Sequence, residues 1–104
     1  MSIKGYHREK FAAAVSSLVG LGDIRGRVES AFVSLVTVNP DQMVSGAGEK
    51  YKSLYAKVTS RQEESEGEGT IRSTLRHMTD EDVSDVAEEI LDIHNQLLRE
   101  FSGA

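Results

Sequence analysis

Hydrophobic residues recur every three to four positions near the end of the chain and divide this stretch into an apolar and a polar side. At about 100° per residue, the apolar positions form one stripe of a helix. They are Val83, Val86, Ala87, Ile90, Ile93, Leu97 and Phe101. This division predicts a long amphipathic helix whose apolar side is buried against the rest of the chain or against a partner.

The start and the end of this helix are also marked in the sequence. Thr79 suits the N-cap position, and Asp82 follows at N3 in a short version of the capping box. Three consecutive acidic residues occupy the first turn, where the helix dipole favours negative charge. Gly103 suits the position after the last turn. We therefore expect a helix over about residues 80–101.

The same periodicity predicts two helices in the first third of the chain. Ser2 can cap the first helix, which we expect to end near Val19, and Asp23 can cap the second, expected over residues 24–38. Residues 32–38 are rich in β-branched side chains and could alternate as a strand. We favour the helix because no other run in the chain could pair with a lone strand.

Asn39 and Pro40 mark a sharp boundary in the middle of the chain. Asn39 suits an N-cap and Pro40 the first helical position, where its missing N–H costs nothing. Two glycines soon afterwards, at positions 46 and 48, interrupt the apolar pattern. We therefore expect a short helical turn at 40–45 and a firmer helix at 49–61.

A polar segment follows before the last helix. Residues 61–69 contain no apolar side chain and four glutamates, which predicts a flexible acidic loop. Thr70 can cap a short helix that ends at His77. We expect Arg72 and Arg76 of this helix to pair with acids of the last helix. The functional alternative is that they hold a phosphate or carboxylate.

These elements predict one all-α domain over residues 1–104, a small helical bundle of four to five helices. With short connections, neighbouring helices should pack antiparallel, and the last helix (about 80–101) should complete the core. Five amphipathic segments in so short a chain leave apolar surface to cover. We therefore expect a protein partner, either another protein or a second copy in a homodimer.

Charge is distributed unevenly along the chain. The net charge is −5, and residues 80–104 alone carry eight acidic side chains against one basic one. This acidity argues against direct nucleic-acid binding, which needs a basic footprint. The acids on the polar side of the last helix are Asp85, Glu88, Glu89 and Asp92. They form either a solvated face, a docking surface for a basic partner or a loose cation site.

The sequence holds no motif for catalysis. The absence of cysteine excludes disulfides, thiolate zinc sites and cysteine nucleophiles. No serine has a local nucleophile signature, and the three histidines share no metal-ligand spacing. We therefore expect no catalytic residue, no metal and no cofactor. With no run of about 18 apolar residues and no convincing signal peptide, a cytoplasmic protein without membrane contact is expected.

His94 interrupts the apolar stripe of the last helix. We expect a buried polar side chain, packed and hydrogen-bonded to a neighbour. The alternative is a pH-sensitive contact or a ligand group, because small shifts move the charge of histidine across neutral pH.

The sequence thus favours a non-catalytic protein-interaction module, such as an accessory subunit, an adaptor or an inhibitor. Its candidate contact residues are Asp85, Glu88, Glu89, Asp92, Arg72 and Arg76. The first alternative is an acidic nucleic-acid mimic that occupies a basic surface of a partner protein. The second is a small-ligand-binding or enzymatic helical domain built around His94, Tyr51 or Tyr55, and the two arginines.

Overall fold

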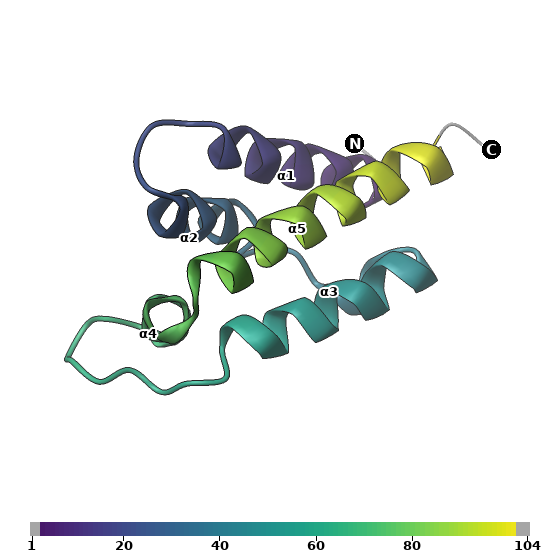
Figure 1. Cartoon of the computed structure of the whole chain (residues 1–104). Coiled ribbons are helices and arrows are strands. Elements are labelled where there is room, and N and C mark those ends of the chain that lie inside the picture. The colour runs from purple at the N-terminus through teal and green to yellow at the C-terminus, as the bar shows by residue number, and fades with distance from the viewer. Residues whose placement is uncertain (1–2, 102–104) are drawn as a thin grey trace.

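Helices joined by loops make up the computed structural model, which describes residues 3–101 (Figure 1). The helices are α1 (Ile3–Leu18), α2 (Ile24–Ser34), the 3₁₀ turn η1 (Pro40–Gln42), α3 (Ser45–Val58), α4 (Thr70–His77) and α5 (Asp80–Phe101). No strand is present between residues 3 and 101. The prediction of an all-α bundle is confirmed.

Helix α5 completes the core, as the apolar stripe predicts. Figure 1 shows α5 running between the α1–α2 pair and α3, and it contacts all three. Its stripe faces inward, with five side chains at most 5% exposed: Val83, Val86, Ile90, Ile93 and Leu97. The predicted positions of Ser2 and Gly103, and the side chain of Phe101, lie outside the described residues.

Three helix starts follow from local capping chemistry. The Oγ1 of Thr79 accepts the N–H of Asp82 at 3.1 Å, and α5 begins at the next residue. Asp23 accepts the N–H of Gly26 at 3.1 Å and caps α2. Asn39 accepts the N–H of Asp41 at 3.0 Å and caps η1. Each cap satisfies a backbone donor that has no partner inside the helix, and all three predictions are confirmed.

Helix α2 ends at Ser34 rather than at residue 38 as predicted. Residues 35–37 form turns, and the N–H of Val38 donates to the carbonyl oxygen of Leu35 at 3.0 Å. This turn buries Leu35 and Val38 but leaves Val36 80% exposed. The physical reason is that β-branched residues are weak helix formers, and both apolar anchors reach the core without another helical turn.

The predicted bounds of α3, residues 49 and 61, are both wrong, because α3 begins at Ser45 and ends at Val58. The two glycines lie in its first turn instead of interrupting it. A Cβ atom at Gly48 would lie 2.4 Å from the carbonyl oxygen of Pro40. Gly48 therefore lets η1 pack directly against α3.

The predicted cap of α4 also needs correction. Thr70 lies inside the helix, and Gly69 holds the N-cap position with φ 83° and no side-chain cap bond. That backbone conformation costs glycine little, whereas side chains disfavour it. The hydroxyl of Thr74 donates to the carbonyl oxygen of Thr70 at 2.8 Å, within the helix.

Two arginines of α2 hold the ends of neighbouring helices. Arg27 donates to the carbonyl oxygen of Leu18, the last residue of α1, at 2.9 Å. Arg25 donates to the carbonyl oxygens of Leu75, at 3.0 Å, and of Met78 at the end of α4. It also pairs with Asp80 at 2.6 Å. Helix C-termini leave carbonyl groups without intrahelical partners, so α2 fastens both α1 and the α4–α5 corner.

Between residues 3 and 101, no helix is long and apolar enough to cross a membrane.

Candidate functional site

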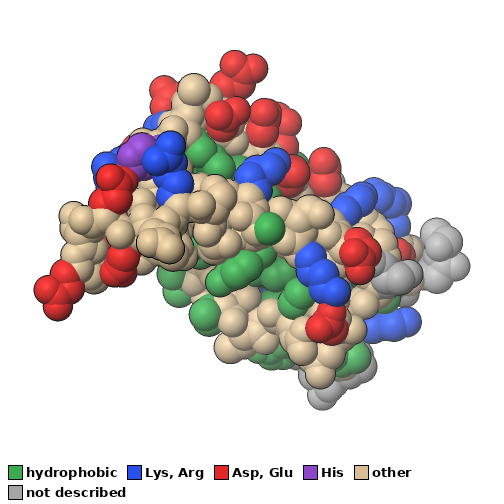
Figure 2. All heavy atoms as spheres, turned by 90° about the horizontal axis from the view of Figure 1, so that it is seen from below, with side chains coloured by type: hydrophobic (Ala, Val, Ile, Leu, Met, Phe, Trp, Pro, Cys, Tyr) green, Lys and Arg blue, Asp and Glu red, His purple; other side chains and the backbone are tan. Residues whose placement is uncertain are grey.

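Apolar side chains line a hollow where α2, η1, α3 and α4 meet. A groove of about 340 Å³ opens there, and we refer to it as the apolar groove. The residues that line it are Phe32, Leu35, Val36, Val38, Pro40, Tyr51, Lys52, Tyr55, Ala56 and Ile71. Nine of these ten side chains are uncharged. Hydrophobic side chains are visible in the middle of the face that Figure 2 shows.

The floor of the apolar groove belongs to the core. Leu35 and Tyr51 are only 1% and 3% exposed. The ring of Tyr51 meets that of Phe11 edge to face, with centroids 5.5 Å apart. Burial, with a smaller contribution from Tyr55, raises the pKa of Tyr51 to about 12. The floor is therefore rigidly held by packing between α1, α2 and α3.

The rim of the groove is exposed and carries charges of both signs, because Lys52 pairs with Asp41 and, at 3.8 Å, with Glu49. Val36 is 80% and Tyr55 47% exposed. The Nζ of Lys52 lies 2.6 Å from Asp41 Oδ1, and this hydrogen bond is the main cause that raises the pKa of Lys52. Tyr55 lies one turn after Tyr51, with ring centroids 6.1 Å apart. The rim can thus contact a partner through an aliphatic side chain, an aromatic ring and charges of both signs.

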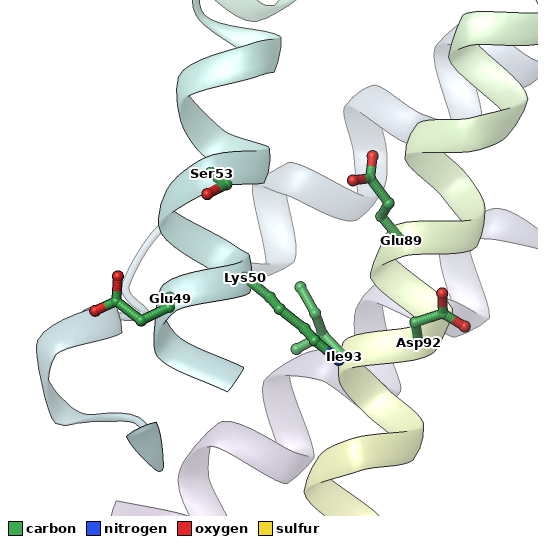
Figure 3. Close-up of a pocket in the computed structure, with 6 residues that line it drawn as sticks. All are labelled: Glu49, Lys50, Ser53, Glu89, Asp92 and Ile93. Carbon is green, nitrogen blue, oxygen red and sulfur yellow. The ribbon is translucent and has the colours of Figure 1, made fainter. Parts of the chain in front are cut away.

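The predicted acidic contact residues lie on another side of the molecule. Asp85, Glu88 and Asp92 of α5 are exposed, whereas Glu89 is half-buried and accepts a bond from Lys57 of α3 at 2.8 Å. Only Glu89 and Asp92 of these four line a second hollow, of about 390 Å³, between α3 and α5. Figure 3 shows them across from the α3 side chains Glu49, Lys50 and Ser53. The structure therefore divides the predicted acidic cluster.

The predicted pairing of the α4 arginines with acids of the last helix is wrong. Arg72 donates two bonds to Glu29 of α2, at 2.8 and 3.0 Å. Arg76 donates to Glu68 at 2.9 Å and to Glu64 at 3.1 Å. The reason is that α4 packs beside α2 and directly follows the segment that carries both glutamates. The arginines line a third hollow of about 340 Å³, where an anion would have to replace these ion pairs.

The acidic segment over residues 61–69 is attached to α4. Ser73 donates to the carbonyl oxygen of Gln62 at 2.9 Å, and the N–H of Arg61 donates to Thr74 Oγ1 at 3.0 Å. Its hydrogen bond to Arg76 is the main cause that lowers the pKa of Glu68. The segment contains neither helix nor strand, and its flexibility stays a prediction.

Two histidines hold ring nitrogens that are shielded from solvent. His94 is half-buried, and no hydrogen-bond partner for its Nδ1 is found among the described residues. No partner is found among the described residues for Nε2 of His7 on α1 either, and this side chain is only 1% exposed. The hydrogen-bonded packing expected for His94 is not seen at its Nδ1.

Acidification should destabilise the protein through His7. Burial lowers the pKa of His7 from 6.5. Lys4, Arg8 and Glu100 line the small cavity beside it. The unfolded chain therefore binds a proton before the folded one does, and stability falls as the pH drops through 6.5 toward the lower folded pKa. Urea unfolding at pH 7.5 and pH 5.5 should show a smaller loss for His7→Gln than for the wild type. Equal losses would contradict this role of His7.

Within the described residues, no group of three or more histidine, aspartate or glutamate side chains is placed to hold a metal ion. The groups of the predicted ligand site also line different hollows: Arg72 and Arg76 lie beside α2, whereas Tyr51 and Tyr55 line the apolar groove.

Comparisons with known proteins give no functional assignment for this chain. No model of a protein family matches the sequence. No curated protein and no solved structure matches it either. The function is therefore inferred from the geometry of the described side chains.

Proposed function

We propose that this chain is a non-catalytic protein-interaction domain that binds its partner through the apolar groove. The observation that carries the proposal is the 80% exposure of Val36 at the mouth of a groove of about 340 Å³ with an apolar floor. Exposed apolar side chains beside a preformed hollow are typical of binding surfaces. The core beneath the rim is already closed, so the exposed surface of Val36 and Tyr55 remains available for a partner.

Burial of the rim can supply binding energy without disturbing the fold. Fully burying a valine or a larger apolar side chain contributes about 1.5–3 kcal/mol. Val36 and Tyr55 both keep exposed surface that a partner can cover, whereas Leu35 and Tyr51 beneath them have almost none. The floor is preorganised by the contact between Tyr51 and Phe11, so binding need not order it first.

The acidic face of α5 supports a second candidate, the nucleic-acid mimic that occupies a basic surface of a partner. Asp85, Glu88 and Asp92 are exposed on one helix, and residues 80–104 carry eight acidic side chains against one basic one. Such binding would weaken steeply with added salt. The apolar groove makes the opposite prediction, because burial of apolar surface depends little on ionic strength.

A photo-crosslinking amino acid in place of Val36 tests the groove in the native host. We expect a discrete crosslinked protein adduct from position 36 that persists at high salt. The matched control is Val19, also 80% exposed but at the end of α1 and outside the groove. Position 19 should give no such adduct. A third probe at Glu88 reports on the acidic face.

The three positions separate the candidate functions. An adduct from position 36 alone supports binding through the groove. A salt-sensitive adduct from position 88 alone would replace the groove with the acidic mimic. No adduct from position 36 would overturn the proposed function.

A further inference from the structure

We infer that the protein that fills the apolar groove is a second copy of this chain, paired with the first about a two-fold axis. The inference rests on the proposed function, because it names the occupant of the same groove. In a two-fold interface one patch meets itself. The patch must therefore be complementary to itself in shape and in charge.

The groove meets the requirement of shape. A self-complementary patch needs a protrusion next to a hollow of matching character. Val36 protrudes at the mouth, 80% exposed, and the hollow beside it has Phe32 and Leu35 on its floor. In a symmetric pair, Val36 of each copy enters the groove of the other. The exposed ring of Tyr55 then covers the contact at low entropic cost, as tyrosine does at many interfaces.

The charges at the rim meet the second requirement. A patch with charges of one sign would repel its own copy, whereas a patch with charges of both signs can pair with itself. Lys52 Nζ lies 2.6 Å from Asp41 Oδ1 and 3.8 Å from Glu49 Oε1, and all three side chains are at least 46% exposed. After a two-fold rotation, Lys52 of each copy can face Asp41 of the other, while Glu49 stays beside Lys52 of its own copy.

The charges on the rest of the molecule also favour a dimer interface at the apolar groove. Each copy carries a net charge of −5, so two copies repel each other at long range. The acids of α5 would meet themselves if that helix formed the interface. Figure 2 shows acidic side chains along the upper edge of the view, at its left end and at the lower right, around the hydrophobic side chains in its middle. Association through the groove keeps the strongly acidic helices away from each other.

Sedimentation equilibrium of the full chain tests the inference. Between about 1 and 500 µM, a range that covers moderate affinities, the average mass should rise from one chain toward two. Val36→Glu should weaken dimerisation at least tenfold, because it buries a carboxylate in the groove. Val19→Glu is the matched control, with equal exposure and equal charge change, and should dimerise like the wild type. Circular dichroism should show the same helicity for all three proteins.

Charge exchange at the rim gives an independent check. Asp41→Lys places a positive charge where Lys52 of the other copy needs an acid, and it should weaken the dimer severalfold. The double variant Asp41→Lys with Lys52→Asp exchanges the two charges, so that each again meets its opposite across the axis, and it should recover dimerisation. Recovery distinguishes pairing across the axis from damage to η1, which the double variant would not repair.

The inference is overturned if the wild type stays monomeric over the whole range, or if Val36→Glu and Val19→Glu weaken the dimer equally. A monomer that still crosslinks from position 36 to a different protein in the host would keep the proposed function and refute the second copy. A monomer without any adduct from that position would refute both.

Discussion

Replacing Phe11 by alanine is expected to lower the free energy of unfolding by about 3–5 kcal/mol. Phe11 lies on α1, is 0% exposed, and meets the ring of Tyr51 on α3 at an interplanar angle of 83°. The substitution removes the buried ring, leaves a cavity between the two helices and abolishes an edge-to-face contact worth about 0.5–1.5 kcal/mol. Urea unfolding followed by circular dichroism measures the loss.

The control for this prediction is Leu21→Ala. Leu21 is fully exposed in the connection between α1 and α2, so its removal should change stability by no more than about 0.5 kcal/mol. Phe11→Leu keeps most of the buried volume and should fall between the two. A loss below about 1 kcal/mol for Phe11→Ala would mean that Phe11 is not part of a closed core. It would also remove the rigid support beneath Tyr51 in the groove.

The features that the sequence predicts best are those fixed by neighbouring residues. Thr79 and Asp82 determine the start of α5 through one bond between a side chain and the backbone. The apolar stripe of α5 recurs at helical period, so its burial needs only some surface to pack against. Asp23 and Asn39 act in the same local way. Local chemistry of this kind is visible in a single sequence.

The misplaced helix ends depend on distant contacts. Helix α2 stops at Ser34 because Leu35 and Val38 both reach the core from a turn. Helix α3 begins at Ser45 because Gly48 allows the carbonyl group of Pro40 to approach. Neither condition can be recognised without knowing which elements pack together. A prediction from helix propensity alone therefore makes α2 too long and starts α3 too late.

The apolar groove could not be predicted from the sequence for the same reason. Four elements build the apolar groove, and no local pattern shows that Val36 and Ile71 line one hollow. The signal in the sequence was the alternation of apolar residues over 32–38. A helix cannot bury all of these side chains, so some of them must stay exposed. The charged residues were easier to select from sequence. Their partners were not, since Arg72 pairs with Glu29 on a helix 43 positions earlier.

Replacing Arg25 by methionine is expected to lower the free energy of unfolding by about 2–4 kcal/mol. Arg25 donates to two backbone carbonyl groups at the end of α4, those of Leu75 and Met78. Bonds from a charged donor contribute about 1.5–3 kcal/mol each, and their contributions do not simply add. Methionine keeps the apolar stem of the side chain, so the loss reports the polar contacts. Thermal and urea unfolding measure it.

Two variants separate the contacts of Arg25. Asp80→Asn removes only the ion pair, whose acidic partner is 88% exposed, and should cost less than about 1 kcal/mol. Arg27→Met removes one close bond to the end of α1, to Leu18 at 2.9 Å, and should cost less than Arg25→Met. Equal losses for Arg25→Met and Asp80→Asn would show that the carbonyl bonds contribute nothing. Because α4 supplies Ile71 to the groove, Arg25→Met should also weaken self-association, whereas Arg27→Met should leave it unchanged.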